Sequence, residues 1–158
     1  VQLARYISAV ANRGNVFELS LLDNVKDRDG NIITEFTPKI SSHIDIDNST
    51  WDYVQLGMRQ VVKDGSAKKV FRDLDVEIAG KTGTTQETKS RANHAFFVSF
   101  APYSNPEITL TVNIPFGYSS SNAALIAKNT YKLYFGYTDI NSIINSKATP
   151  VIDVNVGD

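Results

Sequence analysis

The chain has 158 residues, a formal net charge of −1 at pH 7 and no cysteine. This length allows one domain with a real core, and the near-zero net charge is not the basic footprint of a nucleic-acid-binding protein. The lack of cysteine excludes disulfides and thiolate metal sites, and the two histidines have no metal-ligand spacing. No apolar run approaches membrane length. We therefore expect no metal, no cofactor and no membrane span.

The first segment, Val1–Ala11, has apolar residues at helical spacing. It predicts an amphipathic helix that ends at Asn12–Gly14, where the glycine tolerates a left-handed conformation. The helical pattern is already complete at Val1, without a cap or a lead-in, and we expect the chain to be part of something larger.

A hairpin is expected next. Residues 16–25 are β-prone, Lys26–Asn31 is a charged turn with an Asp-Gly pair, and Ile32–Phe36 forms the return strand. Residues 39–46 are predicted to be irregular or weakly extended. Several N-cap candidates in Asp47–Thr50 then open a second helix, which is apolar on a broad face and stops at Asp64-Gly65.

A basic, polar loop over residues 66–73 is expected to lead to the stretch around which the chain is organised, Asp75–Gln86, with the sequence DVEIAGKTGTTQ. Its first half alternates charged and apolar residues, which predicts a strand with one buried face. Gly80 and Gly83 follow, and glycines in a strand often mark a close approach of another molecule. A lysine and a row of threonines there suit binding, although a strand that ends in a polar turn would explain the same residues.

The remaining segments predict an antiparallel sheet and a closing helix. In order, they are a polar turn at residues 87–93, a strand at His94–Ala101 that is apolar on both faces, a turn at Pro102–Pro106, an alternating strand at Ile108–Ile114, and a helix capped by Ser121 or Asn122 that runs to about Phe135. The architecture is therefore α+β, with a three-strand meander packed on helices. Residues 1–136 form the domain portion and residues 137–158 a C-terminal tail.

Ala79–Thr84 resembles the KTG element of penicillin-recognising serine enzymes. Other segments resemble the transpeptidase domain of class B penicillin-binding proteins over roughly Gln2 to Phe135. These segments are Gln2–Tyr6, Ala11–Gly14, Trp51, Gly57-Met58, Val61-Val62, Gly65–Ala67, His94–Val98, Phe100–Pro102, Asn105–Ile108, Ala123-Ala124 and Tyr134-Phe135. The resemblance implies the C-terminal half of a penicillin-binding, β-lactamase-like fold.

The resemblance also implies a reaction. A peptidoglycan D,D-transpeptidase cross-links cell-wall stem peptides through an acyl-serine intermediate, and β-lactam antibiotics trap that intermediate. Lys81 and Thr84 are then the candidate catalytic residues, while Thr82, Gly83 and Thr84 are the candidate substrate-binding residues. The substrate carboxylate and the developing oxyanion are both negative, so a cation and fixed hydrogen-bond donors are required nearby. The implied location is outside the cytoplasmic membrane, with attachment only through an N-terminal anchor absent from this sequence.

The family's SxxK nucleophile and SxN serine are expected N-terminal to Val1, so the implied partner is the N-terminal half of the same domain, and this chain alone is predicted to be inactive. Two segments imitate these motifs. Ser66–Lys69 fits SxxK, but it lies in a loop just before the KTG element. Ser120–Asn122 fits SxN, but it follows the KTG element and is explained by a loop and a helix cap.

Three other functions remain as alternatives. Gly80–Thr82 resembles the end of a phosphate-binding loop, but Asp75 stands where that motif requires a glycine. A non-catalytic β-lactam-sensing or interaction module could use the same fold. A β-lactamase would need a base that activates a deacylating water, and no candidate is evident. His94 is expected to pack beside the site rather than to act as a general base.

Overall fold

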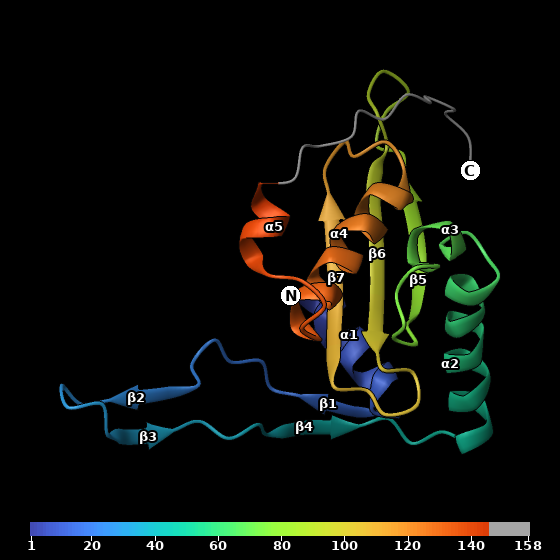
Figure 1. Cartoon of the computed structure of the whole chain (residues 1–158). Helices are drawn as coiled ribbons and strands as arrows, with labels where there is room; N and C mark the ends of the chain where they lie inside the picture. Colours follow the sequence, from blue (N-terminus) through green and yellow to red (C-terminus); the bar gives the residue numbers. More distant parts are fainter. Residues whose placement is uncertain (146–158) are drawn as a thin grey trace.

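A three-stranded antiparallel sheet lies at the centre of the computed structural model, which describes residues 1–145. Its strands are β5 (Ala79–Thr85), β6 (His94–Ala101) and β7 (Ile108–Ile114), in the order β5-β6-β7 (Figure 1). The meander and the α+β class predicted from the sequence are confirmed. β6 is hydrogen-bonded on both edges, so it fixes the positions of its two neighbours.

Helices cover both faces of this sheet. On one face, α4 (Ser120–Tyr134) packs its buried Ala127 and Tyr131 against a cluster that includes Phe97 of β6. On the other face, α1 (Gln2–Ala11) packs its buried Ile7 against a second cluster that includes Phe100. The two phenylalanines are an odd number of positions apart, so the period of two sends them to opposite faces. This explains why β6 is apolar on both faces for most of its length.

The edge of the sheet at β5 is flanked by α2 (Asn48–Lys63) and by a four-residue helix, α3 (Lys68–Phe71) (Figure 1). The loop expected at residues 66–73 is interrupted by α3, so that prediction is wrong for residues 68–71. The short helix forms because Phe71 is buried and stacks on Phe97, with ring centroids 5.4 Å apart. That contact is distant in sequence and gives no local helical signal.

Gln55, which is buried on α2, ties this helix to the end of α1. Its Nε2 donates to the carbonyl oxygens of Val10 (2.8 Å) and Ala11 (3.1 Å) in the last turn of α1, and the Val10 oxygen also accepts from the backbone N–H of Arg13 (3.4 Å). The chain turns away at Arg13 (φ 62°) and Gly14 (φ 112°), so the left-handed helix end predicted at this glycine is confirmed and includes the arginine.

The first half of the central stretch is not a strand, and the alternation in Asp75–Ile78 was therefore misinterpreted. β5 begins only at Ala79. The preceding residues are held by separate contacts: the carbonyl oxygen of Glu77 accepts from the backbone N–H of Tyr103 (2.7 Å), and that of Ile78 accepts from Arg59 (3.2 Å). Ile78 is nevertheless fully buried, as the pattern required.

An arm of two antiparallel ribbons extends away from the sheet (Figure 1). β1 (Asn15–Phe17) pairs with β4 (Ile40–His43), and β2 (Asn24–Lys26) pairs with β3 (Ile32–Glu35). The predicted hairpin is confirmed as β2–β3. Residues 39–46 were expected to be irregular, yet they contain β4, which the distant β1 organises.

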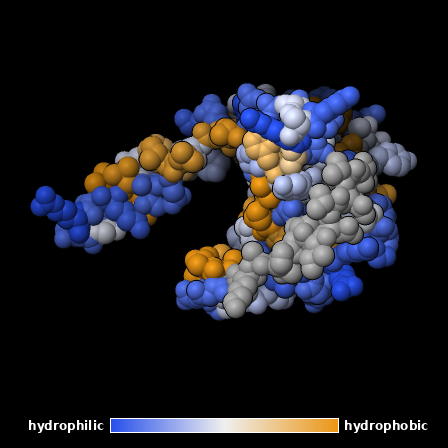
Figure 2. All heavy atoms as spheres, turned by 90° about the horizontal axis from the view of Figure 1, so that it is seen from above, coloured by the Kyte–Doolittle hydropathy of each residue, from blue (hydrophilic) through white to orange (hydrophobic). Residues whose placement is uncertain are grey.

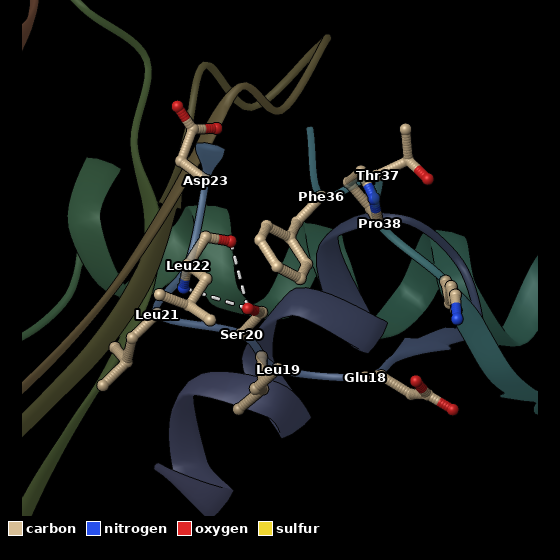
Figure 3. A pocket seen from close by; sticks show the side chains of 10 residues that line it. Glu18, Leu19, Ser20, Leu21, Leu22, Asp23, Phe36, Thr37 and Pro38 are labelled. Atoms are coloured by element: carbon tan, nitrogen blue, oxygen red, sulfur yellow. Dashed lines mark hydrogen bonds between the residues drawn. The ribbon is translucent and has the colours of Figure 1, made fainter. Parts of the chain in front are cut away.

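The arm leaves many large apolar side chains exposed, as Figure 2 shows along its surface. They include Leu19, Leu21, Leu22, Ile32, Ile33, Phe36 and Ile40. A shallow pocket lies where the two ribbons join, between residues 18–23 and residues 36–39 (Figure 3). The Phe36 ring points into this pocket, and Ser20 turns the chain beside it by bonding to both the N–H and the carbonyl oxygen of Leu22 (3.0 Å each).

Helix caps differ in part from those predicted. Asp47 is the N-cap of α2. Ser119, and not Ser121 or Asn122, is the N-cap of α4, and its Oγ accepts from the N–H of Ser121 at 3.3 Å. A further helix, α5 (Ile140–Ile144), is capped by Asp139. The rest of the expected tail, residues 146–158, lies outside the described residues.

Within residues 1–145, no helix is long and apolar enough to cross a membrane.

Candidate active site

The predicted site residues lie on β5, an edge strand of the central sheet. Among the strands of residues 1–145, β5 pairs with β6 alone, so its second edge forms no ladder. Backbone N–H and C=O groups on such an edge are available to an added extended chain. β5 therefore offers a substrate both side chains and one unpaired backbone edge.

The side chains of β5 alternate between the two faces of the sheet. Thr82 is opposite Phe97 and Thr84 is opposite Ala95, both of which belong to the cluster under α4. Lys81 is opposite Val98, which packs with the cluster under α1. The structure thus brings the two predicted threonines to one face and places the predicted lysine on the other. Thr84 is exposed and Thr82 is partly buried.

The Lys81 ammonium is exposed and donates a hydrogen bond to the carbonyl oxygen of Thr82 at 2.8 Å. It forms no ion pair within residues 1–145. Its positive charge is therefore not neutralised by a carboxylate on this part of the chain. A cation held beside a strand edge in this way would attract an anionic ligand.

The two glycines of the stretch serve different purposes. A Cβ on Gly80 would lie 2.5 Å from Cζ of the buried Phe97, so this glycine is required by internal packing and not by an approaching molecule. A Cβ on Gly83 would meet only Cβ of Phe96, at 3.3 Å. Gly83 is partly exposed, so it is the glycine at which a substrate backbone could lie close to β5.

Ser66 contacts this site, which the sequence alone did not predict. Its hydroxyl lies 2.9 Å from the Oγ1 of Thr82, within hydrogen-bonding distance. No hydrogen bond joins Ser66 to Lys69 in the part of the chain that the structure describes, and α3 begins only after Ser66. The segment therefore lacks the helix-borne serine–lysine pair that an SxxK motif requires. The one sequence signal that could have pointed to this contact was the resemblance of Gly65–Ala67 to a segment of the transpeptidase domain.

The other imitation motif, Ser120–Asn122, forms the first turn of α4. Asn122 donates its side-chain amide to the carbonyl oxygen of Gly117 at 2.8 Å, so it closes the loop before the helix. The segment is therefore the start of a helix after a loop, as expected, but the cap expected within it is wrong, because Ser119 is the N-cap.

His94 lies opposite Thr85 at the start of β6. Its Nδ1 accepts from the backbone N–H of Phe116 at 3.2 Å, and its Nε2 is 3.3 Å from a carboxylate oxygen of Glu87. Both ring nitrogens therefore join the β5–β6 turn to the loop after β7, which is a structural role beside the site.

Two buried or charged groups support the sheet beneath the site. Burial raises the pKa of Tyr131 well above its usual value, and its hydroxyl donates to the Oγ of buried Ser99 at 2.8 Å. The Lys128 ammonium, hydrogen-bonded to Asp73, lowers the pKa of that carboxyl to about 2, and Lys132 adds to the effect. Asp73 follows α3, so this ion pair fastens the end of α3 to α4.

Comparisons with known proteins show the family to which the chain is related. Residues 1–132 match the family profile described as penicillin binding protein transpeptidase domain. Penicillin-binding protein 2A of Bacillus subtilis is 29% identical over 136 residues, which are 77% of this chain and 19% of that protein. The peptidoglycan D,D-transpeptidase MrdA of Haemophilus influenzae is 32% identical over 115 residues, which are 62% of this chain and 16% of that protein.

Among solved structures, penicillin-binding protein 2B of Streptococcus pneumoniae superposes with a TM-score of 0.75 at 25% identity. The match covers 89% of this chain and 25% of that one. The chain thus spans less than a fifth of the length of the two relatives described above.

Proposed function

This chain belongs to the penicillin-binding protein transpeptidase domain family, in its class B branch, and we propose that it forms one wall of the active site of a peptidoglycan D,D-transpeptidase. The observation that carries the proposal is the arrangement of β5. It presents Thr82 and Thr84 on one face, Lys81 on the other and an unpaired backbone edge between them. Each of these groups can interact with a particular part of the donor peptide, namely its carboxylate, its acyl group or the oxyanion that forms during the reaction.

The donor ends in D-Ala-D-Ala, which carries a free carboxylate. The hydroxyls of Thr82 and Thr84 share a face of β5, so both can donate to that carboxylate. Gly83 lets the acyl group lie against the strand. A β-lactam carries an equivalent carboxylate and would occupy the same groups.

In the acyl-transfer step, a serine oxygen attacks the donor carbonyl carbon, and the π electron pair of the C=O bond moves onto the carbonyl oxygen. When the carbonyl forms again, the amide C–N bond breaks, and the terminal D-Ala leaves as an amine that has received the serine proton. The backbone N–H of Thr84 is proposed as one donor to that oxyanion, and the amide of the nucleophile serine as the other. Losing one such donor typically costs about 100- to 1000-fold in rate. Lys81 keeps the cleft positive while this charge develops.

The nucleophile is proposed to be an SxxK serine that these 158 residues do not contain, working together with an SxN serine that faces Lys81. Ser66 and Ser120–Asn122 fill neither role in the geometry described above. The companion segment is the N-terminal half of the same domain. We place the assembled site outside the cytoplasmic membrane, where peptidoglycan is cross-linked.

Labelling with a fluorescent penicillin, followed by a denaturing gel, tests this proposal. The 158-residue chain alone is expected to remain unlabelled, and the chain joined to its SxxK-bearing half is expected to be labelled on that half. A covalent label on the 158-residue chain alone would overturn the assignment and point to Ser66. Labelling of the joined protein without cross-linking of stem peptides would favour a β-lactam-sensing module.

A further inference from the structure

Ser66 makes the one hydrogen bond from the loop between α2 and α3 to a proposed substrate-binding side chain in residues 1–145. The two hydroxyl oxygens of Ser66 and Thr82 are 2.9 Å apart and come from residues 16 positions apart.

The backbone around Ser66 is tightly held. The N–H of Gly65 donates to the carbonyl oxygen of Gln60 (2.9 Å), and the N–H of Ala67 donates to that of Val61 (3.1 Å). A Cβ on Gly65 would lie 2.9 Å from Cα of Val61, and Ala67 is only 1% exposed. The backbone of the loop is therefore held against the last turn of α2, and this places the exposed side chain of Ser66 within reach of Thr82.

Thr82 is held from the other side. It lies opposite Phe97 in the β5–β6 register, and Phe97 stacks on Phe71 of α3, which begins immediately after the Ser66 loop. The backbone segments that carry the two hydroxyls are thus each held by packed elements.

When an anion binds to Thr82, the number of hydroxyl protons determines which of the two residues is the donor in the Ser66–Thr82 hydrogen bond. A carboxylate only accepts, so Thr82 must donate its single hydroxyl proton to it. Ser66 must then donate to the Thr82 oxygen. Hydrogen bonds in such a chain polarise one another, so the donor nearest the anion becomes stronger.

We propose that Ser66 is a positioning residue, which selects the orientation of the Thr82 hydroxyl and directs its proton toward the substrate carboxylate. This inference rests on the proposed function, because it needs Thr82 to bind that carboxylate. It assigns no nucleophilic role to Ser66, which would never contact the reacting atoms.

The test uses the protein with its SxxK-bearing half and compares Ser66→Ala, Ser66→Thr and Thr82→Val. Each variant is acylated by a penicillin with a free carboxylate and by its methyl ester. We expect Ser66→Ala to slow acylation by the acid about 3- to 10-fold, the value of one neutral hydrogen bond, and to leave the ester nearly unchanged. Ser66→Thr keeps the hydroxyl and should restore the rate.

Two further measurements make the test decisive. Adding Ser66→Ala to Thr82→Val should cause no additional loss, because the two hydroxyls act in series. Ser41→Ala is the matched control, since its hydroxyl bonds to the carbonyl oxygen of Val16 in the arm, far along the chain from β5. It should leave acylation of both ligands unchanged.

Equal slowing of acid and ester by Ser66→Ala, or no slowing of either, would overturn the positioning role while the carboxylate assignment of Thr82 stands. If Thr82→Val leaves acylation by the acid unchanged, the proposed function of Thr82 fails, and the role of Ser66 fails with it. The Thr82→Val result therefore separates the two failures.

Discussion

Replacing Gly80 by alanine should destabilise the protein, although alanine usually stabilises. The new Cβ would lie 2.5 Å from Cζ of Phe97, 3.0 Å from its Cε2 and 3.0 Å from the carbonyl oxygen of Val98. Carbon atoms in contact are normally about 3.5–4.0 Å apart, so one of the groups must move by about 1 Å. Phe97 has no exposed surface and stacks on Phe71, so its ring cannot move without disturbing the surrounding core.

The expected magnitude follows from two opposing effects. Overpacking of a filled core costs about 1–3 kcal/mol. Alanine also restricts the unfolded chain, which contributes about 0.4–1 kcal/mol in the opposite direction. At the midpoints of these two ranges, the free energy of unfolding should fall by about 1.3 kcal/mol. Urea unfolding should show a lower midpoint at an unchanged slope.

Gly57→Ala is the matched control. Gly57 lies within α2, and a Cβ there would meet nothing within 4 Å. Alanine at this position should therefore raise the free energy of unfolding by up to about 1 kcal/mol. Phe97→Leu should remove the ring that blocks position 80. Gly80→Ala should therefore lower the free energy of unfolding by less in the Phe97→Leu background than in the original protein. Equal or greater stability of Gly80→Ala in the original background would refute the packing argument.

Three further predictions concern the site and its supports. Thr82→Val and Thr84→Val should each slow β-lactam acylation about 10- to 100-fold, the value of a hydrogen bond to a charged group, with unchanged circular dichroism; unchanged rates in both would refute the carboxylate assignment. Asp73→Asn should lower stability by less than about 1 kcal/mol near neutral pH, because the side chain is half exposed. The folded pKa of Asp73 is about 2, below its ordinary 3.8, so this contribution is present above about pH 4 and is lost as the pH falls to 2; urea midpoints that differ equally at pH 2 and pH 6 would contradict it. Gln55→Leu should lower the free energy of unfolding by about 1–3 kcal/mol in urea, because the carbonyl oxygen of Ala11 loses its side-chain donor and that of Val10 keeps only the N–H of Arg13 at 3.4 Å; an unchanged midpoint would show that the Ala11 carbonyl finds another partner.

The sequence predicts those elements whose residues carry their own signal. The alternation in Ile108–Ile114 predicts β7 because the residues on one face of a strand recur at every second position. The apolar run in His94–Ala101 predicts β6 as a strand that is covered on both faces. The face assignments of Thr82 and Lys81 follow from the same period. These predictions needed no knowledge of what the faces contact.

The elements that were missed depend on partners far along the chain. β4 has the polar sequence ISSH and is a strand only because β1 lies beside it. α3 has four residues and depends on the contact of Phe71 with Phe97. The Ser66–Thr82 bond and the fit of Phe97 over Gly80 are likewise side-chain contacts between distant segments. A local pattern contains no information about such contacts.

The arm has a consequence for how this chain behaves in solution. Each of its ribbons has two strands, so every strand in the arm has one edge without a ladder partner in residues 1–145. Apolar side chains such as Ile33 (65% exposed) lie beside these edges. An unprotected apolar edge is a template for pairing with another molecule, so self-association of this chain should rise with concentration and begin at the arm. Lysines placed at exposed arm positions would improve its solubility without touching the sheet that carries the site.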